Sequence, residues 1–293
     1  MEMGASKPST PHGIALVSVL WLLMLLSIIA ISFGTTIRIE AKTTRNVMEY
    51  AKSRALAEAG VAAAIYQLSR QTEDETEQPW ITDGFAYPLT VGDEQVFVTI
   101  FDENGKVDIN HAETELMAAV LTASGIDPAL VDIILNVIAK RREGDRESQA
   151  DSAPSASTAK FESLGELRQA LEIPADQFRR IEPYLTVYSG EAGVNPGTAP
   201  RDVLLALPNV DADQVRFLLE ARTLRHQSEY RAPLPKLSNV ERWLSEASGP
   251  VYTIRAEATV GDDTSFVREA VAWLGRESRV PYRYLDWRRG KMP

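Results

Sequence analysis

The strongest constraint on this chain is an uncharged apolar segment close to its N-terminus. Residues 14–36 contain no charged side chain, and most of them are aliphatic. As a helix, these roughly 23 residues extend about 35 Å, which exceeds the hydrocarbon core of a bilayer at about 30 Å. The sequence therefore predicts one membrane-spanning helix.

The helical pattern continues beyond this segment. No proline occurs between Ile14 and Ser69, so nothing forces a break. Residues 34–36 make a poor cleavage site for a secretory signal, although a signal anchor followed by a stalk remains an alternative. We expect one helix of about 80 Å whose second half is amphipathic and lies on a soluble domain. Its small or apolar stripe consists of Ile37, Ala41, Thr44, Met48, Ala51, Ala55, Ala59 and Ala62.

The rest of the chain has the composition of a folded protein. Overall, 44% of residues are hydrophobic and 25% are charged, which is ordinary globular usage. The chain has no cysteine, which excludes disulfides, zinc–thiolate sites and thiol nucleophiles. The net charge of −10 makes a generic nucleic-acid partner unfavourable.

Two regions show strand patterns. Val96, Val98 and Ile100 alternate before residues 102–105, and an extended pattern resumes at 106–109, which predicts a hairpin with an Asn-Gly turn. Residues 251–260 and 264–274 predict a second hairpin. Helix signals dominate between 112 and 248. This order predicts an α+β fold in which a helical insertion interrupts an antiparallel sheet.

The helical region contains an internal repeat. Residues 125–131, 172–178 and 209–215 align, and each predicts a helix-hairpin-helix unit. Such turns bind DNA phosphates when they are rich in glycine, but two of these turns have Glu172 and Asn209 instead. Each turn is closed by an apolar residue: Ile126, Ile173 or Val210. Each second helix is anchored by an apolar residue: Val131, Phe178 or Val215. Acidic residues stand where a phosphate would bind, namely Asp127, Asp176, Asp211 and Asp213. The repeats are predicted to be scaffold.

The N-terminus resembles a known class of signal. A short polar leader ending in Gly13, followed by apolar residues 14–30, resembles the type III signal of type IV pilins and type II secretion pseudopilins. The resemblance implies cleavage after Gly13 by the prepilin peptidase and methylation of the new N-terminus, Ile14. The leader departs from the family in having Lys7 and His12 rather than a basic residue next to the glycine.

The fifth residue of the processed chain, counted from Ile14, narrows this resemblance to one kind of pseudopilin. Most pseudopilins have a glutamate there, whereas this chain has Ser18, as in the minor pseudopilin called general secretion pathway protein K. Residues 102–112 and 195–199 also resemble segments of the K family, in the same order. The implied organisation is a prepilin leader (1–13), a transmembrane half-helix (14–36), an amphipathic half-helix (37–70), a pilin-like antiparallel sheet in two parts (71–111 and 249–275), an inserted α-helical domain (112–248) and a basic aromatic tail (276–293).

The K family implies a function without catalysis. It implies a minor pseudopilin at the tip of the type II secretion pseudopilus that initiates assembly and supports export of folded proteins. The implied location is the inner membrane, single-pass, with the C-terminal domain in the periplasm. The implied partners are other minor pseudopilins, the major pseudopilin, the inner-membrane platform, the prepilin peptidase and membrane lipid. The alternatives are a minor pilin of a type IV pilus or competence system, and a membrane-tethered helix-hairpin-helix DNA-binding protein.

No residue pattern predicts catalysis. His12, His111 and His226 form neither a spaced ligand pair nor an evident triad. Serine and carboxylate motifs of hydrolases and metalloproteases are also lacking from the sequence. The chain is therefore predicted not to be an enzyme.

Calcium is implied only by the family. K subunits usually have an acidic stretch after the first helical unit, but residues 138–145 have Lys140, Arg141 and Arg142 at its core. Asp145, Glu147 and Asp151 remain possible oxygen ligands, although residues 148–158 are predicted to be a mobile loop. Residues 102–105 lack the spacing of a calcium loop. The tail has two open interpretations, docking on an acidic partner through its aromatic and cationic residues or fraying; these residues are Tyr282, Tyr284, Trp287, Arg288, Arg289 and Lys291.

Overall fold

The fold is taken from a computed structural model of the chain. It describes residues 12–70, 80–150, 160–227, 232–261, 264–275 and 280–291, and within these ranges the side chains of 12–15, 34–37 and 145–150 are not described. Most of the expected leader, residues 1–11, lies outside the described residues.

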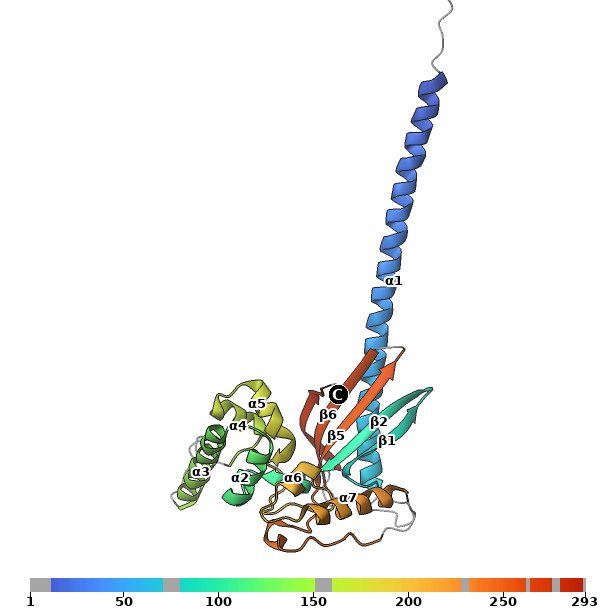
Figure 1. Ribbon diagram of the computed structural model, residues 1–293. Coiled ribbons are helices and arrows are strands. Elements are labelled where there is room, and N and C mark those ends of the chain that lie inside the picture. The colour runs from blue at the N-terminus through green and yellow to red at the C-terminus, as the bar shows by residue number, and fades with distance from the viewer. Residues whose placement is uncertain are drawn as a thin grey trace, which may run out of the picture.

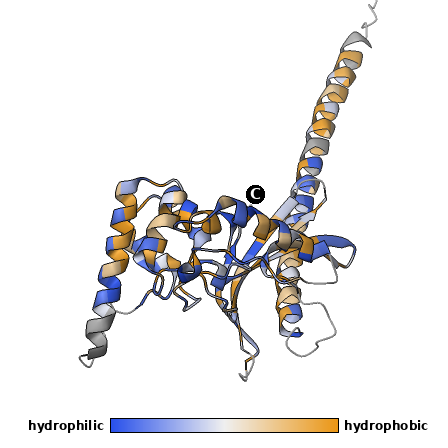
Figure 2. Cartoon of the chain, turned by 60° about the horizontal axis from the view of Figure 1, so that its bottom comes forward, coloured by the Kyte–Doolittle hydropathy of each residue, from blue (hydrophilic) through white to orange (hydrophobic). Residues whose placement is uncertain are grey.

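One helix dominates the molecule. Helix α1 (His12–Arg70) is 59 residues long and unbroken, as the lack of proline predicts. Its first part stands clear of the rest of the chain, and its last part lies against a sheet (Figure 1). Hydropathy along α1 changes from mostly apolar to mixed as it approaches the sheet (Figure 2). The predicted continuous helix is confirmed.

Five antiparallel strands form the sheet. They are β1 (Asp83–Val91), β2 (Glu94–Asp102), β5 (Val251–Val260), β6 (Thr264–Leu274) and β7 (Tyr282–Arg289), in the order β1-β2-β5-β6-β7. The predicted second hairpin is confirmed, because β5 pairs with β6 from Val251 opposite Trp273 to Val260 opposite Thr264.

The predicted first hairpin is wrong. Residues 103–105 form a 3-10 turn, η1 (Glu103–Gly105), instead of a two-residue hairpin turn. The chain then leaves the sheet, and β3 (Val107–Asp108) pairs in parallel with β4 (Leu185–Thr186). Asn-Gly hairpin turns require a positive φ, and neither residue of this pair has one. The actual hairpin joins β1 to β2 through Gly92, whose φ is 64°.

The predicted C-terminal tail also needs correction. Residues 282–289 form β7, which pairs with β6 and extends the sheet by one strand. A β-bulge interrupts this pairing between Val271 and Ala272. The aromatic and cationic residues therefore belong to a folded edge strand, and for them the fraying interpretation is wrong.

Helix α1 packs on the sheet through a different face from the one predicted. Ala51, Ala55 and Ala62, which belong to the predicted stripe, are exposed. The buried face lies next to that stripe, and Gly60 on this face approaches the sheet so closely that an added Cβ would lie 2.8 Å from Val96 Cγ1. The large buried side chains of this face are Leu56, Val61, Ile65 and Leu68.

Helices fill the chain between β2 and β5. They are α2 (Thr114–Ala123), α3 (Pro128–Ala150), α4 (Leu164–Leu171), α5 (Ala175–Ile181), η2 (Glu182–Tyr184), α6 (Arg201–Leu205), α7 (Ala212–Gln227) and η3 (Glu241–Trp243). Helix α3 runs through residues 148–150, so the loop prediction is wrong for these three residues, and the rest of the predicted loop, residues 151–158, lies outside the described part.

The three predicted helix-hairpin-helix units are present as α2–α3, α4–α5 and α6–α7. The turn of each unit has one residue with positive φ at the same aligned position: Gly125 at 72°, Glu172 at 51° and Asn209 at 63°. This agreement shows that the backbone of the repeat persists where glycine has been replaced, although a left-handed glutamate is sterically unfavourable.

The molecule has two separate hydrophobic cores. One lies between α1 and the sheet, and the other lies among the helices between β2 and β5. The helical core already includes Val107 and Ile109, so the insertion begins before residue 112, the boundary expected from the sequence. We call the two bodies the anchor body (α1 with the five-stranded sheet) and the helical body (residues 107–244).

Candidate functional site: the anchor helix and its junction with the helical body

The first half of α1 is fitted to lipid. Its large apolar side chains from Leu16 to Phe33 are each between 53% and 72% exposed. No residue in the most apolar stretch of the helix is buried. Among the described residues, α1 is the one helix long and apolar enough to cross a membrane. A row of exposed leucines and isoleucines is costly in water, so this half of α1 requires an apolar environment.

The predicted processing residues lie at the start of this helix. Gly13 and Ile14 have helical backbone in the first turn of α1, and their side chains lie outside the described set. Ser18 is exposed on the apolar half. The structure thus places these three residues within one and a half turns of α1.

An exposed stretch separates the apolar half from the sheet. Every described side chain from Arg38 to Met48 is exposed. Contact with the sheet begins one residue later, where Glu49 accepts a hydrogen bond from the Thr264 hydroxyl at 3.2 Å. Lys52 then pairs with Glu94 at 2.6 Å. These polar contacts fix the height at which the sheet is attached along α1.

Buried carboxylates hold the junction between the two bodies. Glu103 is 2% exposed and accepts hydrogen bonds at 2.5 Å from the hydroxyls of Thr253 on β5 and Thr186 on β4. Lys106 pairs with the same carboxylate, also at 2.5 Å. One carboxylate therefore contacts both the sheet and the helical body, which gives residues 102–106 a structural role that the sequence did not reveal.

Asp102 lies beside this carboxylate and is 1% exposed. It accepts hydrogen bonds from the Ser248 hydroxyl at 2.9 Å and from the amide of Asn104 at 2.9 Å. Burial nevertheless dominates and raises the pKa of Asp102 to about 6, because desolvation disfavours the charged form. The junction thus contains a carboxyl group that titrates near neutral pH.

A second contact joins β1 to α7. His226 Nε2 lies 3.0 Å from a carboxylate oxygen of Asp83, and each of these side chains is 6% exposed. The imidazole stacks on Phe85 with ring centroids 4.1 Å apart. The sequence placed His226 in a polar run without a role, because its partner is more than a hundred residues away. His111 is different, since it lies beside Asp108 within the helical body.

A buried arginine orders the segment before the third repeat. Arg222 donates to the carbonyl oxygens of Ala199, at 2.7 Å, and Pro196. Burial lowers the pKa of this guanidinium to about 10. Asn195 lies in the same segment and donates to the carbonyl of Ala247 at 2.8 Å. The K-like segment at 195–199 therefore supports the fold of the insertion.

Two of the three helix-hairpin-helix turns are not arranged to bind phosphate. The carboxylate of Asp127 accepts from the amide of Ala129 at 2.8 Å at the start of α3, and that of Asp211 accepts from Asp213 at 2.9 Å at the start of α7. At the starts of α3 and α7, helix amides that would bind a phosphate therefore already have an anionic partner, whereas α5 has no side-chain cap. The geometry agrees with the scaffold interpretation of the repeats.

The expected calcium segment does not fit a cation where it is described. Arg142 donates to the carbonyl oxygens of Ile109 at 3.0 Å and Ala112 at 2.9 Å, and Arg141 pairs with Glu166 at 3.0 Å. The guanidinium groups of Arg141 and Arg142 thus already bind the nearby carbonyl and carboxylate oxygens that a cation would need. Across the part of the chain that the structure describes, no three His, Asp or Glu side chains gather as a metal site. The side chains of Asp145, Glu147 and Asp151 lie outside that part.

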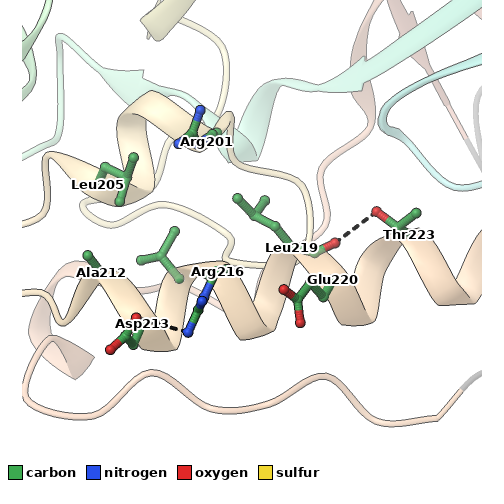
Figure 3. Close-up of a pocket in the computed structure, with 9 residues that line it drawn as sticks. Arg201, Leu205, Ala212, Asp213, Arg216, Leu219, Glu220 and Thr223 are labelled. Carbon is green, nitrogen blue, oxygen red and sulfur yellow. Dashed lines mark hydrogen bonds and ion pairs between the residues drawn. The ribbon is translucent and has the colours of Figure 1, made fainter.

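A groove of about 590 Å³ runs between α6 and α7. Leu205 and Leu219 face it from opposite helices, and the rim carries both signs of charge (Figure 3). Asp213 and Arg216 on this rim pair with each other at 3.0 Å. The rim therefore presents no net charge that would select a ligand.

These features define a class of protein. A long N-terminal helix, apolar and exposed in its first half and packed on an antiparallel sheet in its second, is the architecture that the resemblance to pilins and pseudopilins implies. The α+β fold class is as predicted, with the helical insertion between β2 and β5 as its distinguishing part.

One curated protein is similar to the chain over nearly its whole length. The chain is 21% identical to type II secretion system protein K of Pseudomonas aeruginosa, over 96% of this chain and 94% of that protein. No protein-family model matches the chain. A chain from the crystal structure of the GspK-GspI-GspJ complex of the enterotoxigenic Escherichia coli type 2 secretion system is 18% identical, with 85% of this chain and 100% of that chain covered and a TM-score of 0.49.

The resemblance to protein K is thereby confirmed over nearly the whole length of the chain. The similarity supports a type II secretion minor pseudopilin of the K type. The relative's name is that of a secretion-system component, which is consistent with a non-enzymatic role.

Proposed function

We propose that this chain is a minor pseudopilin that initiates the type II secretion pseudopilus, occupies its tip and supports export of folded proteins across the outer membrane. The observation that carries the proposal is the division of α1 into an exposed apolar half and a half packed on a sheet, in a chain similar to protein K from end to end. In this role the protein acts by assembly, with apolar helix contacts supplying the association.

The tip position rests on two features. Ser18 replaces the glutamate that most subunits use to neutralise the N-terminal amine of a neighbour, and a terminal subunit has one neighbour fewer. The helical body also widens the end of the molecule remote from the apolar half of α1 (Figure 1). A subunit with this bulk leaves no room for another above it.

The proposed location follows from α1. The apolar half spans the inner membrane once, and the sheet and helical body lie in the periplasm. The proposed partners are membrane lipid, the prepilin peptidase, the inner-membrane platform, the major pseudopilin and other minor pseudopilins. The relative in the solved complex is assembled with GspI and GspJ, and subunits of that kind are proposed as neighbours here.

Processing tests the class. We propose cleavage between Gly13 and Ile14, followed by methylation of Ile14. Mass spectrometry of membrane-extracted protein, with and without a co-expressed prepilin peptidase, should show a peptidase-dependent start at methylated Ile14. Replacing Gly13 with leucine should block processing and abolish secretion, whereas alanine in place of nearby Ser9 should leave both unchanged. Normal secretion by the Gly13→Leu protein would contradict the proposal.

Two other functions make different predictions. A minor pilin of a type IV pilus or competence system would share the processing, but its deletion would remove surface pili and leave exoprotein release intact. A membrane-tethered DNA receptor would bind duplex in a salt-sensitive way through residues 112–248. The aspartates that cap α3 and α7 argue against the receptor.

A further inference from the structure

Strand β7 carries a row of aromatic side chains on the sheet face that α1 covers. Trp287 pairs with Ala270, Tyr284 with Ala272 and Tyr282 with Leu274. These three β6 residues belong to the core beneath α1. Directly paired residues lie on the same face of a sheet, so the aromatic row lies beside α1. We call Tyr282, Tyr284 and Trp287 the aromatic shelf.

The shelf is only partly covered. Each of its three side chains is 38% or 39% exposed. Five strands place the outer two about 19 Å apart, whereas a helix with side chains is about 10 Å wide, so one helix cannot cover the whole face. Helix α1 packs mainly on β2, β5 and β6. The large aromatic residues lie on β7, at the part of the sheet face that α1 leaves uncovered.

The shelf is rigid. Tyr284 contacts Tyr282 and Trp287 edge to face, with centroids 5.4 and 4.7 Å apart. The Arg268 guanidinium lies 4.9 Å from the Trp287 ring. On the other face of β7, Arg288 pairs with Glu269 at 2.5 Å and with Glu182 of the helical body at 2.6 Å. Ordered Tyr and Trp side chains bind a partner with little loss of conformational entropy and are typical of interface hot spots.

The flank of α1 next to the shelf carries three exposed alanines beyond Arg54 and Glu58. Tyr50 and Glu58 mark the side of α1 that faces β6 and β7, because Tyr50 contacts Phe266 and Glu58 pairs with Arg268. Ala51 follows Tyr50 by one residue, which is about 100° further around the helix and away from the sheet. The same rotation places Ala55 and Ala62 on this flank, and all three alanines are exposed. Three alanines of the stripe predicted from the sequence thus lie on the side of α1 that is turned toward β7.

The charge at this place is positive although the chain as a whole is acidic. Arg289 is exposed at the end of the shelf and lies over Tyr50, with 5.7 Å from its guanidinium to the ring centroid. No carboxylate partner of Arg289 is found among the described residues. The two nearby glutamates are engaged, Glu49 by Arg45 and Glu58 by Arg54 and Arg268. A docked partner with an acidic side chain at this place would form an ion pair with Arg289.

We propose that the aromatic shelf and the alanine flank together receive a helix of a second pilin-like subunit, which packs beside α1 and places an acidic side chain near Arg289. The small residues permit close approach of the two helices, and the shelf supplies the buried aromatic area. This inference rests on the proposed function and names the surface through which one neighbour is held.

Site-specific photo-crosslinking in intact membranes tests the proposal. The full-length chain carries the photoreactive residue benzoylphenylalanine in place of Tyr284. The matched control replaces Phe97, an aromatic residue that is 48% exposed on β2 and lies between the core residues Val96 and Val98, hence on the opposite face. The Tyr284 position should form an adduct whose cross-linked peptide comes from the N-terminal helix of a different pilin-like subunit, and the Phe97 position should not.

A charge reversal supplies the second measurement. Arg289→Glu should lower the adduct yield at position 284 about fivefold, as expected for the loss of one favourable ion pair and its replacement by repulsion. Arg216→Glu on α7 is the control and should leave the yield unchanged. A yield at 284 no higher than at 97, a peptide from a sheet or loop, or an adduct with a second copy of this chain would overturn the proposal.

The N-terminus is determined in the same membranes. A chain that starts at Ile14 but forms no adduct would contradict the docking surface and leave the proposed function intact. A chain with an uncleaved leader would contradict the proposed function and the docking surface with it.

Discussion

The anchor body and the helical body are built in different ways. The anchor core combines one face of α1 with many alanines and valines of the sheet, so a helix can lie close to the strands. The helical core is richer in leucine and isoleucine, which fill the larger gaps between short helices. Polar side chains such as Glu103, Thr186 and Thr253 join the two bodies. Each body therefore has its own apolar core, and the junction sets their mutual orientation through directional bonds.

The largest effect is expected from a cavity in the helical core. Leu167 on α4 is fully buried there, and Leu167→Ala should lower the free energy of unfolding by about 4 kcal/mol. Because the two cores are separate, amide hydrogen exchange should accelerate in α2 to α5 and remain slow in β5 and β6. Equal acceleration in both bodies would show that they unfold as one unit.

The pH dependence of the junction is expected to come next. The pKa of Asp102 is about 6 in the folded protein, whereas its ordinary value is 3.8. Between these two pH values, Asp102 is mostly protonated in the folded protein and mostly ionised in the unfolded chain. The unfolded state then binds fewer protons, so stability falls as the pH rises from about 4 to 6 and stays lower above it. The effect of this group is up to about 3 kcal/mol.

Asp102→Asn isolates this contribution. The stability of the variant should not fall between pH 4 and 6, and at pH 7 its free energy of unfolding should exceed that of the wild type. Denaturant unfolding at several pH values measures both. The exposed Asp213 provides the control, because Asp213→Asn should leave the pH profile unchanged. A profile for Asp102→Asn that parallels the wild type would contradict the role of burial at this carboxyl group.

A smaller effect is expected in the anchor body. A Cβ on Gly60 would lie 2.8 Å from Val96 Cγ1 and 3.0 Å from the Ala256 Cβ. Gly60→Val should therefore push α1 away from the sheet and cost about 2 kcal/mol. Ala62→Val on the exposed flank is the matched control and should cost little in the isolated protein. Hydrogen exchange in β2 and β5 should distinguish the two variants, and similar protection in both would show that α1 adapts at Gly60.

Periodic and local patterns predicted much of this fold. The unbroken α1, the β5–β6 hairpin and the three helix-hairpin-helix units all have signals within a short stretch of sequence. The buried face of α1 was predicted wrongly because both candidate faces are rich in small residues, and the choice between them depends on strands far away in the chain. Such a choice lies in tertiary packing, which periodicity alone does not specify.

The junction was beyond the reach of local patterns for a similar reason. Residues 102–105 carry a strong hairpin signal, yet the carboxylates of Asp102 and Glu103 bind groups about 150 residues away. Gly105 serves close approach rather than a turn, since an added Cβ would lie 2.7 Å from the backbone of Thr198. The Asp83–His226 contact and the strand pairing of β7 likewise join distant segments.

The smallest expected effect concerns calcium and compares the helical body with its relatives. In this chain Arg142 ties α3 to the segment before α2 through two carbonyl oxygens. A guanidinium supplies a fixed positive charge where the resemblance to the K family implies a metal ion. A metal that binds the folded state raises the midpoint of thermal unfolding in proportion to its affinity, so calcium should have almost no effect here.

Thermal unfolding in excess calcium and in excess chelator should therefore agree to within about 1 °C. Arg142→Met should lower the free energy of unfolding by about 1 to 2 kcal/mol, because two buried carbonyl groups lose their donor, and calcium should not restore it. Lys140→Met, an exposed neighbour on α3, serves as the control. A rise of several degrees with calcium in the wild type would mean that oxygen ligands outside Arg142 and its partners form a metal site, and that the arginines do not replace it.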